Sequence, residues 1–349
     1  MCVIAGYTGD RPAAPILVEM LRRQQCFDGS LSTGIATIHE GKLYWKKVLG
    51  DVDEFLRQVD LSELPGTIGI AHSRPDNNYW EFAHPYVSNN GKLAAVSNGT
   101  SARDFRNEKR SQVAKQLEAA GYTFPIEVVT DKPGALRISN GKAVSLGDVI
   151  VNRAQYYFEK GLEFEAALAA TCSEVFGERV SVMINADVPD RICVARQTRP
   201  MEALIGKGEC YIATSRFGFP EDAKGTVMTL PTLRICSIQK DGVHITSHEI
   251  EGEMVDGVCE ITPLTHIKAY EMIEGFLLGK KENPVNLDEV FFMLREHPEI
   301  FRIKYDYAQF AKVIYDILYE LKREGRLKTE VRPHMTYSGI RNCVMLWLD

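Results

Sequence analysis

The second residue of this 349-residue chain is a cysteine, and its position could give it two reactive groups. If Met1 is removed, Cys2 becomes the first residue and carries a thiol and a free α-amine. An α-amine has a reference pKa of about 7.7–8.0, so it is a usable base at neutral pH. It can accept the thiol proton, directly or through a water, and leave a thiolate nucleophile. Position alone does not decide the matter, because any residue type can follow a first methionine.

Three further segments decide it by their order along the chain. They are Thr33-Gly-Ile-Ala, Gly69-Ile-Ala-His-Ser-Arg74 and Val96-Ser-Asn98-Gly99, with His84-Pro85 between the last two. With Cys2, this set resembles the glutaminase domain of class II glutamine amidotransferases, most closely that of glucosamine-6-phosphate synthases. The similarity runs through roughly residues 2–250 and includes Leu117-Glu-Ala-Ala-Gly-Tyr-Thr-Phe and Glu209-Cys-Tyr-Ile-Ala-Thr-Ser.

The resemblance implies a chemical role for each matched residue. Cys2 would attack the side-chain amide of glutamine, and its amine would move the proton to the departing ammonia. The side chain of Asn98 and the backbone N–H of Gly99 would hold the oxyanion. Arg74 would bind the substrate carboxylate, for which a planar guanidinium suits better than an ammonium. Read locally, Asn98-Gly99 is a turn at a strand end and Arg74 a surface ion pair.

The residue that would bind the substrate ammonium is less well determined. The family has a Thr-Asp-Thr-Glu-Val-Ile segment whose Asp has this role, and Ser145-Leu-Gly-Asp148-Val-Ile is its counterpart here. A strict register places Leu146 at the family's Asp and Asp148 at its Glu. Asp131 is a rival, and we favour Asp148.

The chain departs from the family after Arg74. A Trp-Ala-Thr-His-Gly type run contacts glutamine in the family, whereas this chain has Pro75-Asp76-Asn77-Asn78. Two further hypotheses follow: an N-terminal-nucleophile amidase for another amide, and a catalytically degenerate regulatory or binding protein on the same scaffold. His72 and His84 lie in matched motifs, but a lone histidine beside a strand is more often structural, so neither is assigned a catalytic role.

Short apolar segments interleave with amphipathic ones through the first 250 residues. The expected strands are 3–5, 34–38, 43–45, 67–71, 93–96, 180–184, 191–194, 210–213, 226–229 and 234–238, and the expected helices are 15–23, 105–120, 148–160 and 163–176. The absence of a clean βαβ repeat favours an α+β fold. The resemblance implies a four-layer αββα N-terminal-nucleophile hydrolase sandwich over residues 1–255.

A second, smaller domain is expected over residues 263–349. Helices at 270–278, 287–294 and 307–321 precede strands at 326–331 and 342–348, which is the order of a winged-helix module; a capping or dimerisation domain is the alternative. The segment has 13 basic and 13 acidic residues, so nucleic-acid binding is disfavoured. The phosphosugar isomerase domains of the synthases have no counterpart after residue 250, so ammonia would pass to a partner protein or be released.

Composition excludes several other classes of function. The net charge of -6 gives no basic field for nucleic acid, and the chain has neither a signal peptide nor an apolar run of about 20 residues, which predicts a cytoplasmic protein. Eight scattered cysteines without a C-x-x-C pair predict reduced thiols. His244 and His248 are spaced as a helical metal pair but lie in a strand-like segment, so we expect no metal, and Gly6-Tyr-Thr-Gly9 lacks the residues of a phosphate loop. No cofactor is expected, and a homo-oligomer is left open.

Overall fold

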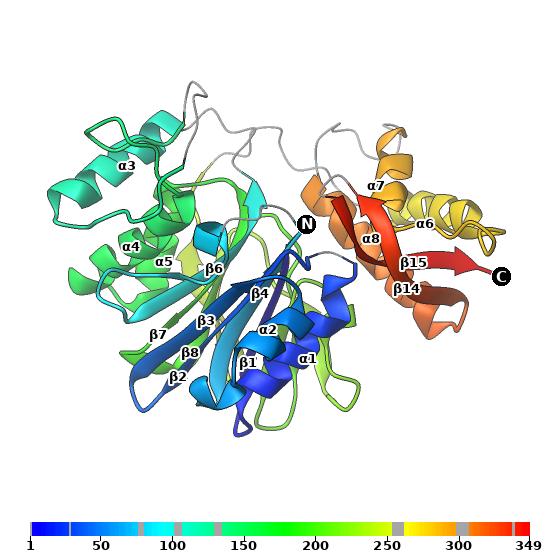
Figure 1. The fold of residues 1–349 in the computed structure, drawn as a ribbon, viewed down its shortest axis with the longest axis horizontal. Helices are drawn as coiled ribbons and strands as arrows, with labels where there is room; N and C mark the ends of the chain where they lie inside the picture. The colour runs from blue at the N-terminus through cyan, green and yellow to red at the C-terminus, as the bar shows by residue number, and fades with distance from the viewer. Residues whose placement is uncertain are drawn as a thin grey trace.

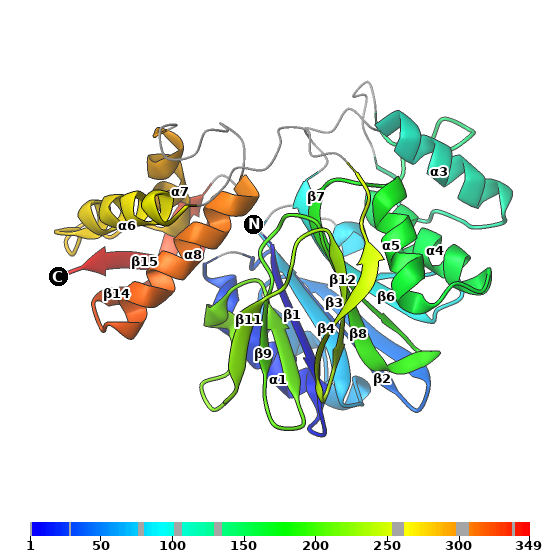
Figure 2. The same cartoon turned by 180° about the vertical axis from the view of Figure 1, so that it is seen from behind.

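Two antiparallel β-sheets stack face to face in the computed structural model (Figures 1 and 2). The structure describes residues 2–27, 29–75, 80–100, 107–128, 135–252, 262–297, 307–336 and 339–349. One sheet has the strand order β11 (Thr226–Thr229), β9 (Glu202–Ile205), β10 (Cys210–Ala213), β1 (Val3–Thr8), β4 (Ile68–Arg74), β2 (Ser32–His39) and β3 (Lys42–Leu49). The other has the order β13 (Gly242–Glu249), β12 (Arg234–Gln239), β8 (Val188–Arg196), β7 (Glu178–Asn185), β6 (Leu93–Thr100) and β5 (Tyr86–Val87).

Helices cover the outer face of each sheet. Helices α1 (Ala13–Gln25) and α2 (Val52–Gln58) pack on the seven-stranded sheet, and α3 (Asn107–Ala119), α4 (Leu146–Glu159) and α5 (Phe164–Glu174) pack on the six-stranded sheet. Three apolar clusters fill the helix–sheet, sheet–sheet and sheet–helix spaces. The expected mixed α and β fold is therefore confirmed, with helices, two antiparallel sheets and helices in successive layers.

Strand β1 carries the start of the chain through the centre of this sandwich. It lies between β10 and β4, and all six of its residues are buried. Val3, Ala5 and Tyr7 face α1, whereas Ile4 faces the second sheet, because successive side chains of a strand alternate between its two faces. Burial on both faces explains the continuous apolar run that predicted this strand.

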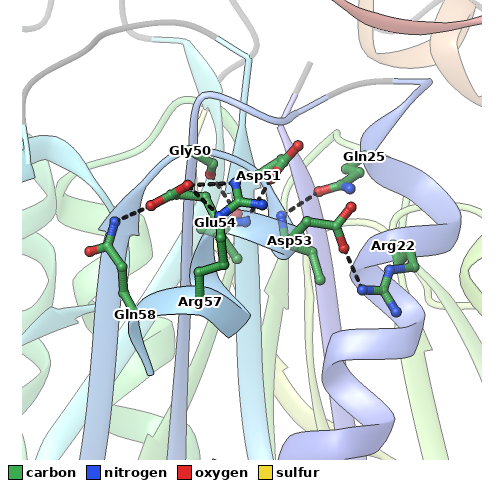
Figure 3. Close-up of polar contacts among 10 residues, drawn as sticks. Arg22, Gln25, Gly50, Asp51, Asp53, Glu54, Arg57 and Gln58 are labelled. Atoms are coloured by element: carbon green, nitrogen blue, oxygen red, sulfur yellow. Dashed lines mark hydrogen bonds and ion pairs between the residues drawn. The ribbon is translucent and has the colours of Figure 1, made fainter. Parts of the chain in front are cut away.

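Helix α2 was not among the expected elements. It has only seven residues, and polar contacts hold its start against α1 (Figure 3). Asp51 caps its first turn, and the side-chain oxygen of Gln25 accepts a hydrogen bond of 2.9 Å from the backbone N–H of Val52. Arg22 and Asp53 form an ion pair of 2.5 Å. These contacts fix the end of α1.

Residues 262–349 form a smaller unit, called the C-terminal module here. It contains α6 (Pro263–Leu277), α7 (Leu287–Arg295), α8 (Tyr307–Arg323) and a ladder of β14 (Leu327–Thr336) with β15 (Gly339–Leu348). The expected order of three helices and two strands is present. Its assignment as a winged-helix module stays a prediction, as does the division into residues 1–255 and 263–349. Residues 253–261, which join the two parts, lie outside the described residues.

The remaining expectations concern metals, disulfides and membranes. His244 and His248 lie on β13, which confirms the expected strand, and His244 Nε2 lies 3.1 Å from Asp241 Oδ1. Within the described ranges, no group of three or more metal-ligating side chains is placed to hold a metal ion, and no disulfide joins the cysteines. No helix in the described part of the chain combines the length and apolarity needed to cross a membrane.

Candidate active site

Cys2 lies directly before β1, at one end of the seven-stranded sheet. The antiparallel pairing of β1 with β4 places Val3 opposite Ser73, so the start of β1 meets the end of β4. Arg74 is the last residue of β4 and follows Ser73 directly. The topology thus brings Cys2 and Arg74, two of the expected site residues, to the same end of the sheet.

Asn98 reaches Cys2 from the second sheet. Its Nδ2 atom donates a hydrogen bond of 2.8 Å to the backbone oxygen of Cys2, across a separation of 96 residues. Asn98 is only 3% exposed, whereas Cys2 is half-buried. Stacking of the sheets places the carboxamide of Asn98 beside the residue expected to be the nucleophile.

Gly99 follows at a point where the backbone leaves no room for a side chain. It pairs with Arg179 of β7, and a Cβ atom at position 99 would collide with the backbone oxygen of Glu178. Glycine is therefore required here by close packing between β6 and β7. Gly99 follows Asn98 directly and lies near the end of β6, the end at which Asn98 contacts Cys2.

Arg74 lies within electrostatic range of two buried histidines, His72 and His84. Its Nη1 atom donates a hydrogen bond of 3.2 Å to the backbone oxygen of Phe82. The rings of His72 and His84 stack with centroids 4.0 Å apart. Burial lowers the pKa of His72 to about 3 and the pKa of His84 well below its usual value, and the charge of Arg74 acts in the same direction. Both imidazoles are therefore neutral at physiological pH.

Asp148 lies in the first turn of α4. Ser145 caps this helix, and its hydroxyl also donates a hydrogen bond of 2.9 Å to the Tyr86 hydroxyl. A side chain at Gly147 would overlap the Tyr86 ring, so the helix start packs closely against that ring. Leu146, the alternative position from a strict register, begins the same helix, and Asp131 lies outside the described residues.

The carboxyl group of Asp148 is buried and only partly satisfied. Burial raises its pKa to about 7, against a backbone hydrogen bond from Ile126 and the charges of Lys47 and Lys142, which lower it. Its Oδ2 atom is buried and has no hydrogen-bond partner among the described residues. An unsatisfied buried carboxylate oxygen is a candidate acceptor for a substrate ammonium.

Tyr86 is the common neighbour of these groups. Burial raises the pKa of its phenol to about 12, the hydrogen bond from Ser145 and the charge of Arg74 lower it, and the charges of Asp148 and Cys2 raise it. All three charged groups therefore lie within electrostatic range of a single ring. The structure gathers Cys2, Asn98, Gly99, Arg74 and Asp148 at one end of the sandwich.

No family model matches the chain, but individual proteins do. They include the proteins named glutamine–fructose-6-phosphate aminotransferase (isomerizing) from the following three organisms. The protein of Pyrococcus horikoshii is 33% identical over 221 residues, covering 61% of this chain and 32% of the relative. The protein of Caldanaerobacter subterraneus is 32% identical over 252 residues, which cover 70% of this chain and 36% of the relative. The protein of Methanothermobacter thermautotrophicus is 27% identical over 352 residues, which cover 95% of this chain and 55% of the relative.

Solved structures agree on the fold. The glutamine phosphoribosylpyrophosphate amidotransferase of B. subtilis, complexed with ADP and GMP, matches with a TM-score of 0.58, 18% identity and coverage of 78% of this chain and 58% of that chain. A structure described as the allosteric regulatory enzyme of purine biosynthesis matches with a TM-score of 0.59 and 18% identity, over 82% and 59%. The chain contains a class II glutamine amidotransferase domain.

The curated relatives are longer proteins, and this chain spans between a third and about half of their length. The resemblance drawn from Cys2, Arg74 and Asn98-Gly99 is thereby confirmed at the level of the domain. The roles of the individual residues and the ammonia acceptor stay predictions.

Sequence reasoning missed two residues of the amidotransferase domain that border the candidate site. One is Tyr86, which follows the matched His84-Pro85 by one residue. The other is Lys47, whose Nζ atom donates to the backbone oxygen of Ala83 at 2.9 Å and lies 4.3 Å from the centre of the Trp80 ring. Burial lowers the pKa of Lys47 to about 8, although Asp148 raises it. In the sequence Lys46 and Lys47 are adjacent lysines of one expected strand. Only the fold shows that Lys47 is the one whose ammonium is buried beside the candidate site.

Proposed function

We propose that this domain hydrolyses the side-chain amide of glutamine to glutamate and ammonia, with Cys2 as the nucleophile. The observation that supports this best is the hydrogen bond from Asn98 to Cys2, because it joins the expected nucleophile to the expected oxyanion donor. The resemblance to glutamine-dependent enzymes supports it independently.

The proposed reaction begins when removal of Met1 frees the α-amine of Cys2. The amine takes the thiol proton, and the thiolate attacks the carboxamide carbon. Asn98 Nδ2 and the Gly99 N–H stabilise the tetrahedral oxyanion. The C–N bond then breaks, the amine returns its proton to the departing ammonia, and water hydrolyses the glutamyl thioester to release glutamate and restore the thiol.

Two charged groups would hold the other end of the substrate. Arg74 is a guanidinium at the strand end beside Cys2 and suits the α-carboxylate. Asp148 offers a buried oxygen without a partner among the described residues to the α-ammonium. We propose that the ammonia passes to an acceptor on a partner protein or is released, and measurement of ammonia with and without candidate partners separates these two fates.

A specific observation favours a second candidate, hydrolysis of a different amide. Lys47 lies within electrostatic range of Asp148 and carries a cation into the region expected to bind the substrate ammonium. The segment after Arg74 also departs from the family run that contacts glutamine. A panel of amides with and without the α-ammonium group distinguishes the two candidates.

Replacement of Cys2 by alanine tests the nucleophile. We expect Cys2→Ala to abolish glutamate release, measured with a coupled dehydrogenase, while the thermal midpoint stays near that of wild type. Asn98→Ala should lower turnover about 10²–10³-fold, because it removes one oxyanion donor. Asn185→Ala, a buried asparagine at the opposite end of the β6–β7 ladder, is the matched control and should retain turnover. Glutamate release by Cys2→Ala protein would refute the assignment.

Mass spectrometry of the purified protein tests the same chemistry without turnover. A glutamine-analogue electrophile should label Cys2 in chains that have lost Met1. Cys26 is the control, since it is the other half-buried cysteine of the described residues and burial raises its pKa to about 11. A retained Met1 with no labelling of Cys2 would favour a regulatory protein over an enzyme.

A further inference from the structure

The connection between α1 and β2 runs beside the candidate site. The described residues of this connection are 26–27 and 29–31, and the backbone N–H of Ser30 donates to Ser73 Oγ at 2.8 Å. The backbone N–H of Leu31 donates to the oxygen of Arg74 at 2.8 Å. The connection therefore holds the last two residues of β4 through two hydrogen bonds.

Gly29 lies still closer to the start of β1. A Cβ atom at this position would lie 2.8 Å from Ser73 Oγ and 3.3 Å from a methyl group of Val3, the residue after Cys2. Its φ of 108° also favours glycine. The backbone of Gly29 therefore packs directly against Ser73 of β4, and the hydrogen bonds of the connection go to β4.

The C-terminal module binds this connection through β15. Arg341 Nη1 donates a hydrogen bond of 3.0 Å to the backbone oxygen of Gly29, and the backbone N–H of Val344 donates one of 2.8 Å to the oxygen of Cys26. The side chain of Arg341 is only 4% exposed, and Asp288 of α7 lies 3.8 Å from its Nη2. The carbonyl of Gly29 and the carboxylate of Asp288 thus offset part of the cost of burying this charge.

The connection is also fixed on its other sides. The ring of Phe27 lies 4.6 Å from that of Phe217, and both belong to the apolar core of the module. Gly50, at the start of α2 in Figure 3, donates to the backbone oxygen of Leu31 at 2.9 Å. Figures 1 and 2 both show the module beside the end of α1 and the start of the chain.

We propose that Arg341 is a positioning residue for the glutamine site, an inference that rests on the proposed function. Through Gly29 it orders the α1–β2 connection, which in turn fixes the end of β4 and the guanidinium of Arg74. The C-terminal module thereby sets the affinity of the site for the substrate carboxylate. Cys2 and Asn98 are joined by a separate contact from β6, so the chemical step depends on Arg341 far less.

Steady-state kinetics of Arg341→Met in the full chain provide the main test. We expect KM for glutamine to rise about tenfold with kcat within about twofold of wild type, because a carboxylate contact acts on the ground state and the transition state alike. Arg341→Lys keeps a cation near Asp288 and should give an intermediate KM. Arg332→Met is the control, since Arg332 is a 44% exposed arginine of the same hairpin.

Hydrogen exchange supplies a readout that needs no turnover. The amides of Ser30 and Leu31 should exchange faster in Arg341→Met than in wild type and remain unchanged in Arg332→Met. If Arg341→Met does not fold, Arg341→Lys carries both tests. An unchanged KM, a fall in kcat at constant KM, or equal exchange in all variants would overturn the proposal.

Binding separates this inference from the proposed function. Calorimetry of glutamine binding to Cys2→Ala protein, with and without Arg341→Met, measures affinity in the absence of hydrolysis. A tenfold weaker Kd in the double variant supports the positioning role even if wild type proves inactive, in which case the proposed function alone fails. An equal Kd in the two proteins, or no glutamine binding by Cys2→Ala protein, overturns the positioning role.

Discussion

At the scale of single residues, burial sets the protonation states around the proposed nucleophile. Burial lowers the pKa of His72 to about 3, so this histidine cannot act as a general base near neutral pH, the role histidine most often has in catalysis. Burial brings Asp148 and Lys47, which are of opposite charge, to pKa values of about 7 and about 8. The α-amine of Cys2 has a reference pKa of about 7.7–8.0 and belongs to the same residue as the thiol, so it is the base of the proposed reaction.

The pH dependence of catalysis should report Asp148. Only the carboxylate form attracts a substrate ammonium, so kcat/KM for glutamine should rise as pH increases through about 7, the pKa of Asp148. Because the charge of Lys47 lowers that pKa, Lys47→Met should move the rise to higher pH. Lys46→Met, an exposed lysine on the same strand, should leave it in place. A profile insensitive to Lys47→Met would contradict the assignment of this limb to Asp148.

Sequence reasoning singled out Cys2 by its position, but it reached Arg74, Asn98, Gly99 and Asp148 only through the resemblance. Nothing local to Asn98 indicates that it contacts Cys2, because the contact depends on the stacking of two sheets. Tyr86 and Lys47 remained unidentified for the same reason. Strands with strong local signals were predicted in the right place, because burial on both faces demands apolar residues. The expected ranges 3–5 and 67–71 fall on β1 and β4, but these strands continue to Thr8 and Arg74.

At the scale of elements, short segments were predicted least well. Helix α2 was missed because seven residues contain too little periodicity, and its start is fixed by contacts with Gln25 and Arg22 of α1. Helix α7 is nearly as short, with nine residues, but its sequence carries a strong apolar pattern and a capping box of Asn286 and Glu289. Helix α2 therefore depends more on tertiary contacts with α1, and helix α7 depends more on signals within its own sequence.

The capping box should contribute measurably to stability. Asn286 Oδ1 accepts a hydrogen bond of 3.0 Å from the Glu289 N–H, and the Glu289 carboxylate accepts one of 2.8 Å from the Asn286 N–H. Asn286→Ala should lower the free energy of unfolding by about 1 kcal/mol. Urea titration followed by circular dichroism measures this. Exposed Asn283→Ala is the control, and an equal loss in both variants would show that the cap contributes nothing specific.

At the scale of the whole molecule, the two expected domains share one apolar core. Phe217 belongs to the amidotransferase domain by sequence, yet its ring packs against Phe27 and against Tyr319 of α8, with centroids 5.4 Å apart in the second pair. A polar contact reinforces this seam, since Lys312 Nζ lies 3.0 Å from the carboxylate of the buried Glu202. The sequence predicted two units, but local patterns contain no information about which surfaces of the two units contact each other.

This shared core should make the two units unfold together. Tryptophans at positions 45 and 80 report the amidotransferase domain, and Trp347 reports the C-terminal module, so single-tryptophan variants follow each part separately. We expect coincident transitions in urea for the otherwise unchanged chain. Phe217→Ala should lose about 3–5 kcal/mol and separate the two midpoints, with the module unfolding first, because this ring of the amidotransferase domain packs in the apolar core of the module.

Phe219→Ala provides the matched comparison. Phe219 is equally buried but packs in the core between α1 and the seven-stranded sheet, away from the module. Its loss should therefore lower both midpoints together. If Phe217→Ala and Phe219→Ala both gave a single shifted transition, the Phe217 contacts would not couple the units. Cooperativity would then have to come from β15 and its contacts with Cys26 and Gly29. In that case Arg341→Met, which removes one of those contacts, should separate the midpoints instead.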